Sequence, residues 1–195
     1  MKIQELHIDD SEYPDDLRQI ADPPPILYYT GDLSILKKLK VAIVGTRMAT
    51  AYGESQAFNF AKDLSLRDVC IVSGLAYGID GAAHRGALEG IGGSIAVLAQ
   101  ALPSISPAAH IKLAEKIVEC GGLLLSEKKE GPILKYEYLM RNRIISGLCK
   151  GVLVVEAAER SGSLNTAKHA LEQGRNVMCI PGRITDIQSA GSNRL

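Results

Sequence analysis

Six short runs of apolar residues recur along the chain after residue 40, and stretches that favour helices separate them. The runs occupy residues 41–45, 69–73, 94–98, 122–126, 151–156 and 176–180, and helices are expected near 52–67, 79–90, 108–120, 136–148 and 163–173. Apolar runs without polar alternation are typical of strands covered on both faces. Strands joined by helices form right-handed βαβ units. We therefore predict an α/β fold, a Rossmann-like, doubly wound and mostly parallel sheet with helices on both faces.

The first 40 residues have a different pattern. Asp22-Pro23-Pro24-Pro25 is a rigid extended segment, because proline fixes its own φ and restricts the residue before it. Residues 26–30 then read as a strand that ends at Gly31-Asp32. Because this segment is too short for a core of its own, we expect residues 1–40 to form an arm packed on a main domain of residues 41–195.

Composition narrows the classes of function. The 195 residues include 22 Lys+Arg and 22 Asp+Glu, so the formal net charge is zero and nucleic-acid binding would need a local basic cluster. The four cysteines are scattered without metal spacing and read as reduced, mostly buried residues of a cytosolic protein. No signal peptide is visible, and no apolar run approaches the roughly 20 residues of a membrane span. We expect a cytoplasmic protein with no metal site and no cofactor.

In such a sheet ligands bind where strands lead into helix N-termini. The first strand is followed by Gly45-Thr46-Arg47, which lacks the dinucleotide fingerprint GxGxxG. A turn at Gly45 could present N–H groups to a phosphate, and Arg47 adds a cation able to bind it with two hydrogen bonds. The alternative is a tight-turn glycine beside a surface arginine.

The loop after the second strand offers a second candidate. Ser73, Gly74 and Gly78 form a strand-to-helix turn suited to an anion-binding nest. Asp80 and His84 follow at i,i+4 spacing on one helix face. A catalytic Asp/His dyad is conceivable, but the favoured interpretation is that Asp80 lies near the helix start and steadies His84.

Two later segments also carry chemistry. On a helix Lys135, Tyr138 and Arg141 share one broad face, which would give single-stranded nucleic acid charge for phosphates and a ring for stacking. The alternative is a solvated helix with a half-buried tyrosine. Ser161-Gly162-Ser163, with Thr166 one turn later, is an N-cap signature that offers hydroxyl and N–H groups to an anion, or simple capping. A lone carboxylate at Glu156 is weak evidence for a base.

Several ordered strings resemble the bacterial DNA-processing protein A (DprA/Smf) family. They are VAIVGTR (41–47), VSGLAYGIDGAAHRGAL (72–88), LLSE (124–127), RNRIISGL (141–148), VLVVEAAERSGSLNTAKHALEQGRNV (152–177), IPG (180–182) and GSN (191–193). The resemblance covers nearly the whole chain. It implies a homodimer that binds single-stranded DNA in a positive pocket, delivers RecA onto it in natural transformation or recombination, and catalyses no reaction.

Motif positions carry residue roles from the family onto this chain. Arg47 matches a phosphate-binding arginine, Lys135 matches a pocket lysine, and Tyr138 stands where the family has a stacking phenylalanine. The expected nucleic-acid-binding set comprises Gly45, Thr46, Arg47, Ser73, Gly74, Gly78, Lys135, Tyr138, Arg141, Arg143, Ser161, Gly162, Ser163 and Thr166.

The chain also departs from the family pattern. Residues 98–102 replace its glycine-rich loop, Ser106-Pro107 replaces Tyr-Pro, Leu139 replaces a proline, and Asn165 stands where an apolar residue is common. The family's last Rossmann residues and a winged-helix tail are expected to be absent after Gly191-Ser192-Asn193.

The rival hypothesis is an enzyme on a related fold, a nucleotide phosphoribohydrolase of the Lonely-guy (LOG) type. That class carries Pro-Gly-Gly-x-Gly-Thr followed by glutamate, whereas here Pro181-Gly182 precedes Arg183 and Ser161-Gly162-Ser163 lacks the double glycine. This difference in motif favours a DNA-binding protein over the enzyme. A nucleotide sensor without catalysis stays open, since an anion nest suits a nucleotide phosphate equally.

Overall fold

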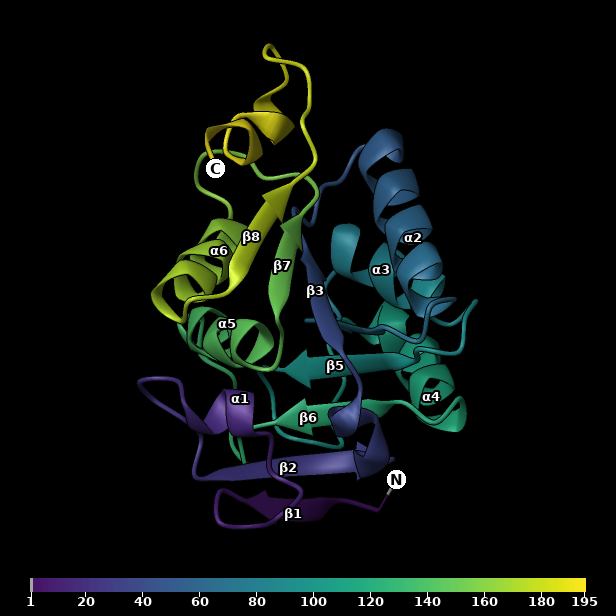
Figure 1. Ribbon diagram of the computed structural model, residues 1–195, viewed down its shortest axis with the longest axis vertical. Helices are drawn as coiled ribbons and strands as arrows, with labels where there is room; N and C mark the ends of the chain where they lie inside the picture. The colour runs from purple at the N-terminus through teal and green to yellow at the C-terminus, as the bar shows by residue number, and fades with distance from the viewer. Residues whose placement is uncertain (1) are drawn as a thin grey trace.

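The computed structural model describes residues 2–195, which form one eight-stranded sheet in the order β1-β2-β6-β5-β4-β3-β7-β8 (Figure 1). The strands are β1 (Gln4–His7), β2 (Ile26–Gly31), β3 (Lys40–Val44), β4 (Cys70–Ser73), β5 (Ser94–Leu98), β6 (Leu123–Ser126), β7 (Gly151–Val154) and β8 (Asn176–Cys179). Strands β3 to β8 pair in parallel, while β1 and β2 pair antiparallel at one edge. The predicted doubly wound, mostly parallel α/β fold is confirmed.

Helices cover both faces of the sheet, as Figure 1 shows. They are α1 (Asp15–Arg18), α2 (Ala51–Ser65), α3 (Ile79–Ala87), α4 (Ile111–Glu119), α5 (Glu137–Gly147) and α6 (Gly162–Glu172), with short 3-10 turns η1 (Leu33–Lys37), η2 (Ala108–His110), η3 (Ile187–Ser189) and η4 (Ser192–Arg194). Alternate strand residues such as Val72 and Ile71 point to opposite faces. Val72 joins the core under α1, α5 and α6, whereas Ile71 joins the core under α2 and α3. Helix α4 packs on a third cluster that includes Leu98 and Leu124.

The strand order reverses at β3. From β3 the chain proceeds through β4, β5 and β6 on one side, then returns to place β7 and β8 on the other side. The loops after β3 and β7 therefore leave neighbouring strands in opposite directions, and the crevice between them is the usual ligand position in an open α/β sheet.

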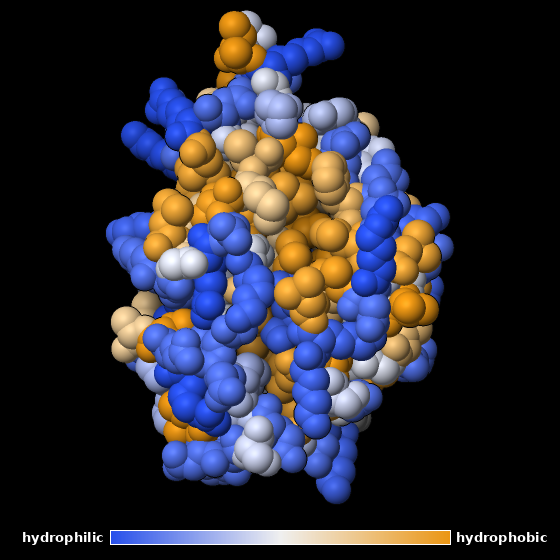
Figure 2. Space-filling model, viewed as in Figure 1, coloured by the Kyte–Doolittle hydropathy of each residue, from blue (hydrophilic) through white to orange (hydrophobic). Residues whose placement is uncertain are grey.

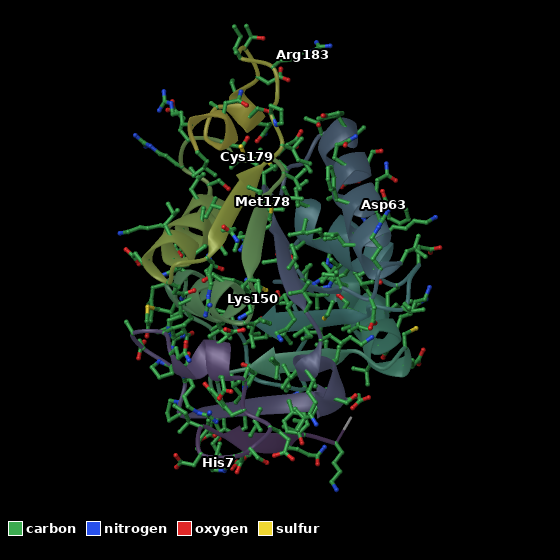
Figure 3. The ribbon with its side chains drawn as sticks, viewed as in Figure 1. His7, Asp63, Lys150, Met178, Cys179 and Arg183 are labelled. Atoms are coloured by element: carbon green, nitrogen blue, oxygen red, sulfur yellow. The ribbon has the colours of Figure 1, made fainter. Side chains whose placement is uncertain are left out.

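The N-terminal segment becomes part of the sheet. Strand β2, predicted at residues 26–30, pairs with β6, and β1, which the sequence analysis missed, pairs with β2. Ionic contacts add to this attachment: Lys150, labelled at the start of β7 in Figure 3, pairs with Asp16 of α1 at 2.7 Å. Arg175 pairs with the same carboxylate at 3.4 Å.

The sixth apolar run was wrongly expected to be covered on both faces. Its strand, β8, ends the sheet, and Asn176 and Met178 on its outer face are exposed. Met178 keeps 44% of its surface accessible, and Figure 3 labels it beside Cys179 along β8. Figure 2 shows hydrophobic side chains gathering over this part of the molecule, between α6 and α2. Within residues 2–195, no helix is long and apolar enough to cross a membrane.

Candidate nucleic-acid interface

A cavity of about 280 Å³ opens at the reversal point, between the carboxyl ends of β3 and β7. Its wall includes Val44 and Gly45 at the end of β3, and Ala76 and Asp80 from the segment after β4. Eight of the predicted binding residues line it: Gly45, Arg47, Tyr138, Arg141, Ser161, Gly162, Ser163 and Thr166. The remaining six, namely Thr46, Ser73, Gly74, Gly78, Lys135 and Arg143, do not line this cavity.

Arg47 supplies the accessible positive charge at the cavity. Its guanidinium carbon lies 5.0 Å from the centre of the Tyr138 ring, a cation–π distance. Within residues 2–195 no carboxylate lies within ion-pair distance of Arg47, and its side chain is exposed. The loop after β3 and the first turn of α5 therefore present a cation and an aromatic ring together.

The turn that carries Arg47 is held by close packing of two loops. The N–H of Thr46 donates to the carbonyl of Glu156 at 2.8 Å, so it is not free for a phosphate. Gly78 has φ 68°, and a Cβ there would lie 2.5 Å from the Thr46 carbonyl oxygen. Thr46 and Gly78 thus position the two loops, and their contact with a ligand stays a prediction.

The N-terminus of α6 forms the opposite wall. The Ser161 hydroxyl caps the helix by accepting from the N–H of Ser163 at 3.4 Å, and the two hydroxyls lie 2.7 Å apart. Asn142 of α5 donates to the Gly162 carbonyl at 3.1 Å, which fixes the start of α6 against α5. The capping interpretation of the serine motif is confirmed, whereas anion binding at the cavity, which these residues line, stays a prediction.

The predicted nest after β4 already holds an anion from the protein itself. One Asp80 carboxylate oxygen accepts from the N–H groups of Gly74 and Ala76 at 3.1 and 3.3 Å. Between them Leu75 adopts φ 59°, a left-handed conformation that is costly for leucine. The Ser73 hydroxyl is also occupied, since it donates to the Ile43 carbonyl at 2.7 Å. The Ser73 hydroxyl and the Gly74 N–H are therefore occupied within the protein, and contact of these residues with nucleic acid stays a prediction.

The pairing of Asp80 with His84 was also wrong. Asp80 turns back to its own loop, while the Nδ1 of His84 lies 2.7 Å from the Ser94 hydroxyl on β5. The Ser94 hydroxyl in turn donates to the Ile71 carbonyl at 3.1 Å. His84 is fully buried between α3 and the sheet, so the i,i+4 spacing places two residues on one helix face without joining them.

Arg141 forms the floor of the cavity. It is 8% exposed and donates to the carbonyl oxygens of Gly74, at 3.0 Å, and Val97. Burial lowers the pKa of Arg141 to about 10, and the nearby Asp80 charge opposes that effect. Burial raises the pKa of Asp80, and Arg141 and the loop N–H groups work against it. Most of the Arg141 charge is therefore engaged inside the protein.

Arg143 lies in a different cluster. It is 6% exposed and donates to Glu127 at 2.6 and 2.8 Å and to Asp22 at 3.0 Å. Burial opposes its charge, but the hydrogen bonds and charges of Glu127 and Asp22 together outweigh burial and raise the pKa of Arg143. Arg143 therefore ties the N-terminal segment to α5, and its contact with nucleic acid stays a prediction.

Lys135 was predicted to share a helical face with Tyr138. Helix α5 begins at Glu137, and Lys135 is exposed in the turn before it. Lys135 is accessible to solvent. Because it lies outside the helix, helical spacing does not determine which way its side chain points.

A smaller neighbouring cavity contains residues that the sequence analysis missed. It measures about 80 Å³ and shares Arg47, Tyr138 and Arg141 with the first cavity. Tyr77 and Gln100 complete its wall, from the loops after β4 and β5. Tyr77 belongs to the family-like string of residues 72–88. Gln100 belongs to the loop of residues 98–102, which departs from the family pattern.

Comparisons with known proteins agree with this architecture. The chain is 50% identical to Protein Smf of Escherichia coli over 188 residues, which cover 95% of this chain and 50% of that protein. The structure of DNA processing protein A from Streptococcus pneumoniae superimposes with a TM-score of 0.93 at 43% identity, covering all of this chain and 68% of that one. The Helicobacter pylori protein, described with a single-stranded DNA binding mode, gives a TM-score of 0.88 at 30% identity, covering 97% and 86%.

The chain spans half the length of its Escherichia coli relative. The family described as DNA recombination-mediator protein A matches residues 4–195, almost all of the sequence. The sequence motifs, the fold and this match agree, and the chain belongs to the DNA recombination-mediator protein A family, the DNA-processing (DprA/Smf) proteins.

Proposed function

We propose that the cavity at the β3–β7 reversal binds single-stranded DNA by holding a backbone phosphate. The observation that carries this proposal is the Arg47 guanidinium, unpaired with any carboxylate in residues 2–195, stacked on Tyr138 at the cavity. Opposite it stands the N-terminus of α6, whose dipole favours an anion. A phosphate between them would gain charge-assisted hydrogen bonds from both sides.

The exposed ring of Tyr138 favours single-stranded DNA over duplex DNA as the ligand. Its ring is partly exposed at the cavity, so an unpaired base could stack on it, whereas the bases of a duplex are already stacked. The exposed Lys135 before α5 is included as a further phosphate contact. The Helicobacter pylori relative, which is 30% identical, is described as binding the same ligand, and this adds support.

The wider role rests on family resemblance. We propose that the protein acts as a homodimer that protects single-stranded DNA and delivers RecA onto it during natural transformation or recombination. We also propose that it catalyses no reaction. The alternative, a LOG-type phosphoribohydrolase, requires a motif that Pro181-Gly182-Arg183 does not supply. Release of free base from AMP by the purified protein, at enzyme-like rates, would favour that alternative.

The test is fluorescence anisotropy with labelled oligo-dT and a matched duplex at two salt concentrations. We expect tighter binding to the single strand and weaker binding at higher salt, because phosphate contacts release counterions. Arg47→Ala should weaken binding and lower the salt slope by about one unit. Tyr138→Ala should cost about 1–3 kcal/mol with little change in slope.

Arg67 offers a matched control, because it is an exposed arginine beyond the C-terminal end of α2 and lines none of the cavities described. Arg67→Ala should leave both affinity and salt slope near the parent values. Equal affinity for duplex and single strand, or an Arg47→Ala protein that folds normally and binds like the parent, would refute the proposed site.

A further inference from the structure

The cavity at the reversal point has a carboxylate in its wall as well as two guanidinium groups. Among residues 2–195, the charged residues that line it are Arg47, Arg141 and Asp80, two positive and one negative, which gives a net charge of +1. The charged residues of the smaller neighbouring cavity are the same two arginines. A site of this charge is complementary to a ligand group that carries a single negative charge.

Asp80 is held in a fixed position by the turn after β4. The residue is 6% exposed, and one of its carboxylate oxygens accepts from the N–H groups of Gly74 and Ala76. Leu75 adopts its left-handed φ of 59° between these two N–H groups, so the chain accepts a local cost to aim both of them at one carboxylate. A carboxylate bound in this way is not free to swing aside when an anion enters the cavity.

The surroundings of Asp80 favour its ionised form. The two N–H donors and the nearby Arg141 charge act against burial, which raises the pKa of the Asp80 carboxyl. Arg141 is fixed as well, because it donates to the carbonyl oxygens of Gly74 and Val97, and a Cβ on Gly74 would lie 2.5 Å from its Nη2 atom. The floor of the cavity therefore carries one fixed negative and one fixed positive charge, which leaves Arg47 as the accessible cation.

We propose that Asp80 makes the cavity selective for phosphodiesters, the internal phosphates of a strand, against phosphomonoesters such as a free nucleotide or a phosphorylated strand end. A phosphodiester carries one negative charge, whereas a phosphomonoester carries close to two at neutral pH. Among the residues that line the cavity, Arg47 is the accessible cation for the first charge, and the second charge would be repelled by the Asp80 carboxylate. This inference rests on the proposed DNA-binding function and names a residue that sets the class of phosphate bound.

The experiment compares two mononucleotides that differ by one methyl group, thymidine monophosphate and its methyl phosphodiester. Each competes with labelled oligo-dT at mildly alkaline pH and constant ionic strength, and backbone amide shifts in NMR spectra report millimolar binding at the cavity. The parent should bind the diester at least as tightly as the monoester, although the monoester has the larger charge. Asp80→Asn keeps the shape of the side chain without its charge, and it should raise the monoester-to-diester affinity ratio about fivefold.

Asp63→Asn is the matched control, because it removes the same charge from an exposed position on α2, labelled in Figure 3, that lines neither cavity. It should keep the ratio of the parent. A merely structural effect of Asp80→Asn would weaken both mononucleotides alike and leave their ratio unchanged. Circular dichroism and thermal unfolding show whether each variant is folded.

The outcomes separate this inference from the proposed function. If the parent does not bind oligo-dT, the proposed function fails and the selectivity fails with it. If the parent binds oligo-dT but binds the monoester more tightly than the diester, the selectivity alone is refuted, and this comparison needs no variant. A folded Asp80→Asn protein that keeps the ratio of the parent would also refute it, as would a parent whose cavity amides shift with neither mononucleotide.

Discussion

A buried histidine should make the fold sensitive to mild acid. His84 of α3 is completely buried, and its Nδ1 lies 2.7 Å from the Ser94 hydroxyl. Its Nε2 has no hydrogen-bond partner in the part of the chain that the structure describes. Burial lowers the pKa of His84 to about 3, and the nearby charges of His110, Arg141 and Arg85 act in the same direction.

The size of the effect follows from the pKa difference between the two states. An unfolded histidine has a pKa of about 6.5, so unfolding takes up a proton at any pH between the two values. The stability that depends on neutral His84 is present above about pH 6.5 and is lost as pH falls towards 3. From pH 7.5 to 5 the free energy of unfolding should drop by about 2 kcal/mol through this residue.

The assay is urea unfolding of His84→Asn and the parent at several pH values from 5 to 7.5. Asparagine retains a polar atom near Ser94 but does not titrate. We expect a lower absolute stability, because the smaller side chain leaves a void, and a shallower decline with falling pH. His7→Asn, which changes an exposed histidine, is the control and should keep the parent slope. If His84→Asn declines as steeply as the parent, His84 is not the acid-sensitive group.

Two further substitutions test the packing around the site by urea unfolding and oligo-dT binding. Arg141→Met should lower the free energy of unfolding by about 3–5 kcal/mol, because it removes the cation that offsets the buried Asp80 charge. A loss of DNA binding without any loss of stability would contradict this role. Gly86→Ala should cost about 1–3 kcal/mol, because its Cβ would lie within contact of the Phe58 carbonyl where α2 packs on α3, while DNA affinity per folded molecule stays unchanged. Unchanged stability would show that α2 and α3 can move apart to make room for the added methyl group without cost.

The central strands were predictable because their burial is encoded locally. A strand covered by helices on both faces needs mostly apolar residues, and β3 to β7 show that pattern, with polar residues only at strand ends: Lys40, Ser73, Ser94 and Ser126. The exposed face of β8 depends on its edge position in the strand order, which no local pattern contains. Strand β1 escaped prediction because its burial alternates over only four residues, with Leu6 alone buried.

Helix α5 shows why the site was only partly predictable. Residues 141–147 are all buried, so this helix has no solvent face along that stretch although it carries Arg141, Asn142 and Arg143. Helical spacing predicts which residues share a direction, but not what lies in that direction. Arg141 lines the floor of the cavity, whereas Arg143 binds Asp22 of the N-terminal segment. Tyr138 lies beside Arg47, two residues that the sequence named separately, because the ends of parallel strands meet at one edge of the sheet.

The turns after β3 and β4, which both suit an anion, differ in whether the protein itself fills them. The turn after β4 has the glycine-rich geometry that recruits anions, but Asp80 fills it, and the buried Arg141 lies close enough to offset that charge. Asp80 and Arg141 therefore offset each other's charge inside the protein, although Arg141 still lines both cavities. Within residues 2–195 Arg47 has no carboxylate partner, so an anion approaching the reversal point meets its charge and the start of α6 together. The self-filled nest therefore leaves the β3–α6 side as the place where an external phosphate gains most.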